Sequence, residues 1–158
     1  MYERILLPLD LSSPESQTKA AETAVTLAKG FSARVYPMTV IPDYGLSRVI
    51  GAYFPIGFEE MAETDARNAL SDFVAQEIPA DLLGTRFVAH GTIYQEILAV
   101  ADQVGADLIV MASHRPELQD YLLGPNAARV VRHAKCSVFI ARRDEEPVGR
   151  GDTTAATH

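Results

Sequence analysis

Short apolar runs alternate with longer amphipathic segments along most of the chain. The runs, which Gly, Pro or polar residues bound, predict strands at Arg4–Leu9, Ala33–Ile41, Arg86–Ala89, Leu108–Ala112 and Ser137–Ala141. The segments between them predict helices at Pro14–Lys29, Phe58–Glu77, Thr92–Val104 and Asn126–His133. Continuous apolar strands separated by helices are typical of a parallel sheet with both faces covered. The pattern therefore predicts a doubly wound α/β domain.

Several Ser, Gly and Pro residues predict where these elements begin and end. Ser12 or Ser13 is placed to cap the first helix, and Gly30 is placed to stop it. Gly105 should stop the third helix in the same way. Pro37 is unusual inside a strand because it has no N–H, so we expect a bulge or a gap in pairing there. The stretch Pro42–Pro55 is the longest irregular segment and is the predicted flap.

Composition limits the class of protein. A chain of 158 residues, 47% of them hydrophobic, suits one domain. We place it at residues 1–143, and we expect the polar residues 144–158 to form a disordered tail. A net charge of −7 argues against a nucleic-acid partner, and no apolar run is long enough for a membrane span.

The N-terminal segment and the cysteine content indicate the cellular compartment. The apolar run at the N-terminus is too short for a signal peptide. The single cysteine, Cys136, rules out an internal disulfide and is expected to be a small buried hydrophobe. We therefore expect a soluble cytoplasmic protein that does not act at a membrane.

In an open parallel sheet, ligands bind beyond the carboxyl ends of the strands, where the winding reverses. The first such segment, Pro8 to Ser12, carries Asp10, which can accept a hydrogen bond from a ribose hydroxyl or a base amine. An alternative is that Asp10 caps the following helix. The second segment, Thr39 to Pro42, can pair with a base edge through its backbone, or it is a plain strand end.

The third segment leads from the fourth strand to the fourth helix. Ser113, His114 and Arg115 all donate hydrogen bonds to anions, and the amides of Asn126 and Ala127 can close a cradle around one. A helix N-terminus also favours an anion through its unpaired N–H groups and its dipole. The segment therefore predicts a phosphate site.

Four stretches of the chain point to a known family: ILLPLDLS, VAHGTIYQEIL, ADLIVMASHR and LLGPNAARVVRHAKCSVFIAR. Through them the chain resembles the universal stress protein A family over almost all of residues 1–143. The resemblance implies a five-stranded parallel sheet of order 3-2-1-4-5 and a dimer that forms through the last strand. In nucleotide-binding members it also implies the motif Gly-x2-Gly-x9-Gly-(Ser/Thr) after the fourth strand.

This chain departs from that motif. Ala112 and Arg115 stand at the first two glycine positions, the interval to Gly124 is one residue shorter, and Pro125 replaces the Ser or Thr. The shortened form resembles a bacterial subgroup in which some members still bind ATP. Pro125 removes a donor but suits the first position of a helix, and Arg115 adds a charged partner for phosphate.

Two functions remain open at this point. The first is a stress-response regulatory module that binds ATP, ADP or AMP, with or without Mg²⁺, acts as a homodimer and hydrolyses ATP slowly at most. The second is a dimeric interaction protein of the same fold that does not bind nucleotide. For the first, the expected binding residues are Pro8, Asp10, Leu11, Ser12, Val40, Met111, Ala112, Ser113, His114, Arg115, Gly124, Pro125, Asn126 and Ala127.

The remaining histidines do not indicate a metal site. His90 is interpreted as a surface residue and Gly91 as a tight turn into the third helix. His114 and His133 are distant in sequence and lack an accompanying carboxylate cluster. We therefore expect no metal other than the Mg²⁺ that ATP can carry.

Overall fold

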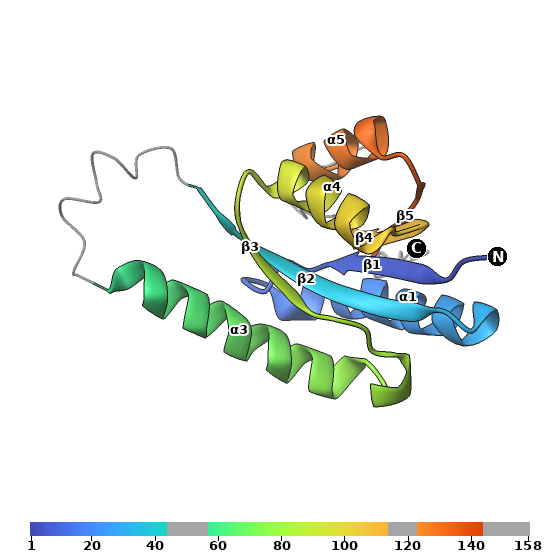
Figure 1. Ribbon diagram of the computed structural model, residues 1–158, viewed down its shortest axis with the longest axis horizontal. Coiled ribbons are helices and arrows are strands. Elements are labelled where there is room, and N and C mark those ends of the chain that lie inside the picture. The colour runs from blue at the N-terminus through green and yellow to red at the C-terminus, as the bar shows by residue number, and fades with distance from the viewer. Residues whose placement is uncertain (44–56, 114–122, 144–158) are drawn as a thin grey trace, which may run out of the picture.

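A five-stranded parallel sheet forms the centre of the molecule in the computed structural model, which describes residues 1–43, 57–113 and 123–143 (Figure 1). The sheet order is β3-β2-β1-β4-β5, as expected. The strands are β1 (Arg4–Pro8), β2 (Arg34–Pro42), β3 (Phe87–Gly91), β4 (Leu108–Ala112) and β5 (Ser137–Ala141). Because β1 lies between β2 and β4, the winding reverses beside β1, and the carboxyl ends of these three strands meet there.

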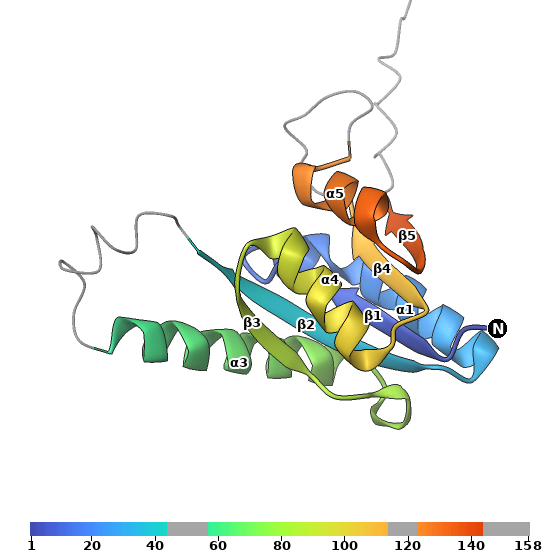
Figure 2. The same cartoon turned by 45° about the horizontal axis from the view of Figure 1, so that its top comes forward.

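Helices cover both faces of this sheet. On one face lie α1 (Thr18–Phe31) and α3 (Phe58–Glu77), and on the other lie α4 (Ile93–Val104) and α5 (Pro125–His133). Figure 2 shows α5 beside β4 and β5 at one edge of the sheet. Two short 3-10 helices, η1 (Pro14–Ser16) and η2 (Ala80–Leu82), complete the described elements. The predicted doubly wound architecture is confirmed.

The side chains of β1 show why both faces need a helical cover. Ile5 and Leu7 pack into the core beneath α1 and α3, whereas Leu6 packs into the core beneath α4. All three are fully buried. Since side chains alternate between the two faces of a strand, a strand buried on both faces requires apolar residues at successive positions.

Pro37 lies inside β2 without breaking it. On one side it pairs with Leu7 of β1. On the other side, pairing with β3 begins only at Met38, after an isolated bridge between Val35 and Leu83. Backbone groups alternate in direction along a strand, and the carbonyl of Met38 accepts from Leu9 N on the β1 side. The missing N–H of Pro37 therefore faces the gap before β3. The sequence predicted either a bulge or a gap in pairing at this position, and the structure has the gap.

Both predicted ends of α1 were wrong. The helix begins after Gln17, because the hydroxyl of Ser12 bonds Asp10 and that of Ser13 bonds Glu15, so neither caps a backbone amide of α1. At the other end the helix continues through Gly30 to Phe31, whose ring packs edge-on against Tyr2 with centroids 5.3 Å apart. The left-handed stop is Ser32, with φ 56°.

Other predicted boundaries are close to the observed ones. Gly105 ends α4 with φ 65°, as expected, and Thr92 is the N-cap of that helix rather than its first residue. Of the predicted flap, Pro42 belongs to β2, and residues 44–56 lie outside the described residues, as does the predicted tail at 144–158. Within the described ranges, no helix is long and apolar enough to cross a membrane.

Candidate functional site

A cleft of about 460 Å³ opens at the carboxyl ends of β1, β2 and β4. Its walls come from the β1–η1 loop, the end of β2, the end of β4 and the N-terminus of α5, with one residue from α3 and two from α4. The predicted site residues that line it are Pro8, Asp10, Leu11, Ser12, Val40, Met111, Ala112, Gly124, Pro125, Asn126 and Ala127. The fold therefore gathers three segments that are far apart in the sequence.

Three predicted site residues are not placed in the cleft. Ser113 follows β4, but it is not among the lining residues, and its amide donates to the carbonyl of Ala141 at 3.0 Å. That bond fixes the end of β4 to β5 and leaves the Ser113 amide unavailable to a ligand. His114 and Arg115 lie outside the described residues.

Asp10 is held in a local turn at the cleft. Its Oδ1 accepts from the amide of Ser12 at 3.1 Å and from the hydroxyl of Ser12 at 2.6 Å. This side-chain turn resembles a backbone turn and fixes the carboxylate relative to the end of β1. Asp10 is not the N-cap of η1 or of α1, whose N-caps are Ser13 and Gln17, so the alternative of helix capping is not what the structure shows.

Gln17 supports the same loop from its buried side, a role that the sequence pattern did not predict. The side chain is 2% exposed. Its Oε1 accepts from the amide of Asp10 at 3.2 Å, and its Nε2 donates to the hydroxyl of Ser16 at 2.7 Å. Ser16 in turn donates to the carbonyl of Ser13 at 2.7 Å. One buried amide thus links both ends of the loop that carries Asp10.

The end of β2 presents backbone groups to the cleft. The carbonyl of Met38 points toward β1, and alternation along the strand gives the N–H and C=O of Val40 the same direction. Pairing with β1 ends at Met38, so the backbone of Val40 faces the cleft beyond the last pair. The buried hydroxyl of Thr39 donates to the carbonyl of Leu9 at 3.0 Å and fixes the two segments to each other.

Helix α5 directs its first turn at the opposite end of the cleft. Gly124 is the N-cap and Pro125 the first helical residue, in the position where a proline costs no hydrogen bond. The first bond of the helix runs from the amide of Ala128 to the carbonyl of Gly124. The amides of Asn126 and Ala127 precede it and therefore have no acceptor within the helix, and they lie at the positive end of the helix dipole.

The lining is apolar on one side and polar on the other. Ile41, Ile93 and Ala66 contribute aliphatic surface from β2, α4 and α3. Ile93 and Ile97 reach the cleft through the packing of α4 against β2. Among the described lining residues, Asp10 is the one charged side chain. An aliphatic wall and an acidic group suit a flat base and a ribose better than a metal ion.

The sequence model of the universal stress protein family matches residues 1–142. The chain belongs to the universal stress protein family. Universal stress protein G of Shigella flexneri is 30% identical over 143 residues, which are 90% of this chain and 100% of that protein.

Solved structures of the family share the fold of this universal stress protein. UspA from Lactobacillus plantarum has a TM-score of 0.65 and 27% identity, with 89% of this chain and 98% of that one covered. A universal stress protein in complex with cAMP has a TM-score of 0.55 and 21% identity, with coverage of 90% and 98%. At that identity, the likeness to the cAMP complex shows the fold alone.

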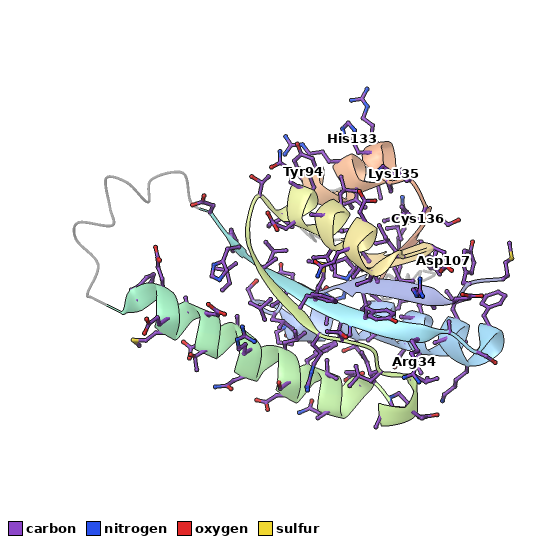
Figure 3. All side chains as sticks on the ribbon, in the orientation of Figure 1. Arg34, Tyr94, Asp107, His133, Lys135 and Cys136 are labelled. Atoms are coloured by element: carbon purple, nitrogen blue, oxygen red, sulfur yellow. The ribbon has the colours of Figure 1, made fainter. Side chains whose placement is uncertain are left out.

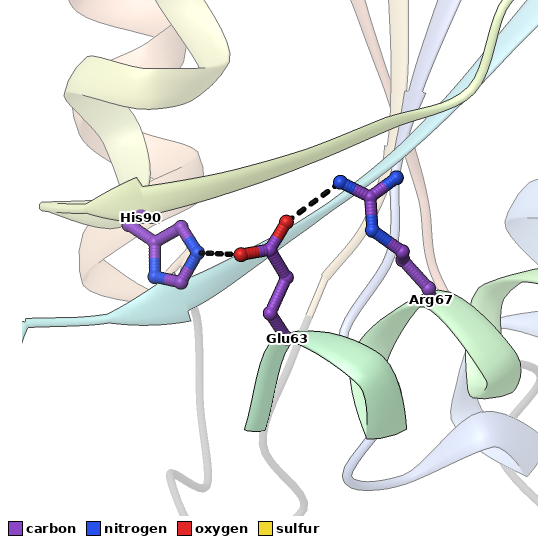
Figure 4. Close-up of polar contacts among 3 residues, drawn as sticks. All are labelled: Glu63, Arg67 and His90. Carbon is purple, nitrogen blue, oxygen red and sulfur yellow. Dashed lines mark hydrogen bonds and ion pairs between the residues drawn. The ribbon is translucent and has the colours of Figure 1, made fainter. Parts of the chain in front are cut away.

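Polar groups outside the cleft have structural roles. His90, at the end of β3, is an exposed residue whose Nε2 lies 3.6 Å from Glu63 of α3, and Arg67 bonds the other oxygen of Glu63 at 2.6 Å (Figure 4). Cys136 is half-buried, and this burial raises the pKa of its thiol. The described residues contain no group of three His, Cys, Asp or Glu that could hold a metal.

Proposed function

We propose that this universal stress protein binds an adenine nucleotide of the ATP class in the cleft and acts as a regulatory module. The observation that carries the proposal is that one cleft presents the backbone of Val40, the carboxylate of Asp10 and the first amides of α5. These groups come from β2, from the segment after β1 and from the segment after β4, which are successive positions in the sheet.

The spacing of these positions suits a nucleotide. Neighbouring strands are about 4.8 Å apart, so β2 and β4 are separated by about 10 Å. A base beside Val40 would lie against the aliphatic wall of Ile41 and Ile93. The ribose would then lie beside Asp10, whose carboxylate accepts hydroxyl donors, and the phosphates would reach the amides of Asn126 and Ala127.

The phosphate end requires positive charge that the described lining residues do not supply. Arg115 follows β4 in the sequence and is the residue that we assign to this role, with Ser113 and His114 as its polar neighbours. A universal stress protein that binds cAMP supports an adenine nucleotide as the ligand class. Any Mg²⁺ would enter with the phosphates of ATP rather than at a preformed protein site.

The decisive experiment is calorimetry of ATP and of 2′,3′-dideoxy-ATP with the wild type and Asp10→Ala. If Asp10 accepts from ribose hydroxyls, the substitution should weaken ATP binding about tenfold, the scale of one charged hydrogen bond. It should leave the affinity for dideoxy-ATP unchanged, because that ligand has no hydroxyl to donate. Arg115→Ala should weaken ATP more than adenosine, since only ATP carries phosphate.

Matched variants separate these effects from general ones. Asp81→Ala removes the same charge from the exposed η2 segment and should not alter ATP affinity. Asp10→Asn keeps an oxygen for Ser12, so it tests the charge without removing the turn. Failure of ATP to bind the wild type would reject the proposal and favour the alternative of an interaction protein without a nucleotide.

We also propose that the protein forms a homodimer through β5. This strand is at one edge of the sheet, and its Phe139 is 44% exposed. Val131, on the helix that packs against β5, is 45% exposed. An apolar edge strand invites pairing with another chain, and a two-fold axis beside β5 would bring the same surface together from both copies.

A further inference from the structure

The segment that follows the cleft has a charge opposite to that of the molecule. The chain has a net charge of −7. Residues 123–143, by contrast, contain neither Asp nor Glu and carry Arg129, Arg132, Lys135, Arg142 and Arg143. Such a local reversal concentrates positive charge on α5 and the strand that follows it. It also leaves most of the acidic residues on other elements, including Glu59, Glu60 and Asp65 of α3.

Helix geometry places part of this charge on one face. Arg129, Arg132 and His133 are separated by three and four residues, so they share a side of α5, and all three are exposed. Ala127 and Val130 are on the buried side. Figure 3 shows His133 at the end of α5, Lys135 just after that helix, and Tyr94 on the neighbouring α4. We call Tyr94, Arg129, Arg132 and His133 the α5 basic face.

The contacts of this face fix its aromatic and cationic groups. The guanidinium carbon of Arg129 lies 5.1 Å from the centre of the Tyr94 ring, and the rings of Tyr94 and His133 are 6.3 Å apart. Stacking holds the guanidinium plane while its edge keeps N–H donors for a carboxylate. Within the described residues, neither Arg129 nor Arg132 takes part in an ion pair.

The carboxylates of α4, the helix beside α5, do not pair with Arg129 or Arg132 within the described residues. Lys135 pairs with Asp102 of α4 at 3.0 Å. Asp102 therefore neutralises Lys135 rather than Arg129 or Arg132. Glu96 of α4 lies against Gly91. A cation in the last turn of a helix interacts favourably with the dipole, which accounts for Arg132 and His133 but not for Arg129 in the middle of α5. Stabilisation of the helix therefore does not explain the position of Arg129 over Tyr94.

We propose that the α5 basic face is a docking surface for an acidic segment of a partner protein, in which carboxylates pair with Arg129 and Arg132. The surface is distinct from the cleft, since none of its four residues lines the cleft. Charge complementarity selects the partner: two guanidinium groups bind two carboxylates in bidentate fashion. The face extends over one side of a short helix, and the acidic remainder of the molecule would repel a long polyanion such as a nucleic acid.

The test uses the full-length protein, saturated with ATP, and a fluorescein-labelled hexaglutamate peptide followed by fluorescence anisotropy at low salt. The wild type should bind hexaglutamate and not hexaglutamine. The double variant Arg129→Gln/Arg132→Gln should bind hexaglutamate about tenfold more weakly, as expected for lost charged hydrogen bonds. The control Lys29→Gln/Arg86→Gln removes the same charge from exposed positions on other elements and should retain most of the affinity.

Four results would overturn the proposal. Absence of hexaglutamate binding to the wild type would remove the surface altogether. An equal loss in the control pair would show attraction by diffuse charge. Tighter binding of an oligothymidine than of hexaglutamate, with the same two arginines required, would assign the face to nucleic acid. The fourth is a double variant with a lower thermal stability and an unchanged affinity for hexaglutamate. That result would show that the two arginines only stabilise α5.

Discussion

At the scale of single residues, the cleft depends on one buried amide. Gln17 accepts from the backbone of Asp10 and donates to Ser16, which bonds Ser13. A substitution of Gln17 removes the acceptor that it offers to the Asp10 amide and the donor that it offers to the buried Ser16. Gln17 acts on the cleft through Asp10, so we regard it as a positioning residue.

We predict that Gln17→Leu lowers the free energy of unfolding by about 1–3 kcal/mol, the usual cost of a buried unsatisfied group. Urea denaturation measures this loss, and it does not depend on what the cleft binds. Gln76→Leu is the matched control, because Gln76 is exposed on α3 and should change stability little. A Gln17→Leu protein as stable as the wild type would show that the loop is held by its other bonds.

The sequence allowed most of the residues that line the cleft to be predicted, but not the buried Gln17 that holds the loop carrying Asp10. Asp10, Val40 and Pro125 could be selected because they follow strands or begin a helix, and such positions converge in a doubly wound sheet. Gln17 carries no such signal. Its role arises from burial beneath a turn, which depends on where η1 ends and α1 begins. The sequence predicted one helix from Pro14, whereas α1 begins at Thr18.

At the scale of elements, apolar periodicity was sufficient for every strand and α-helix that the described residues contain, but not for the 3-10 helices η1 and η2. The errors lie at their ends. The hydroxyls of Ser12 and Ser13 bond neighbouring carboxylates, and the packing of Phe31 on Tyr2 extends α1 past Gly30. These side-chain interactions compete with the expected capping and stop of α1, and a sequence pattern does not show which of them is the more stable.

Element packing also gives a prediction about pH. Glu63 of α3 contacts His90 of β3, so the pair links a helix to the edge strand of the sheet. The hydrogen bond and charge of Arg67 lower the pKa of the Glu63 carboxyl, with a smaller effect of His90. A carboxyl whose pKa is lower in the folded state stabilises the protein above its unfolded-state pKa. That contribution disappears as the pH falls through the folded-state value.

We therefore predict that Glu63→Gln is less stable than the wild type at pH 7 and equally stable at a pH below the folded-state pKa of Glu63. The effect should be small, because the carboxylate is exposed and screened by solvent. Thermal unfolding across this range measures it, with Glu60→Gln on the same helix as the control. A difference that persisted in acid would mean that the stabilisation is not electrostatic.

At the scale of the whole molecule, the two edges of the sheet differ. The β3 edge is next to α3, whose residues Glu63 and Arg67 form an ion-pair cluster with His90. The β5 edge has the exposed Phe139 and, on the neighbouring helix, Val131. Side chains of β5 alternate, so Val138 and Ile140 pack beneath α4 and α5 while Phe139 is on the other face of the sheet. A second copy at this edge would cover Phe139.

We predict that the wild type sediments as a dimer at micromolar concentration and that Phe139→Lys weakens self-association. The substitution places a charge where two copies of β5 would meet, and a buried unpaired charge is costly. Phe58→Lys is the matched control, because it makes the same chemical change at another exposed phenylalanine. Phe58 is 46% exposed at the start of α3, and that end of α3 is far from β5 in the fold. Analytical ultracentrifugation compares the three proteins. If Phe58→Lys dissociates the dimer and Phe139→Lys does not, the interface lies at α3, and a monomeric wild type, with or without ATP, would exclude assembly through either surface.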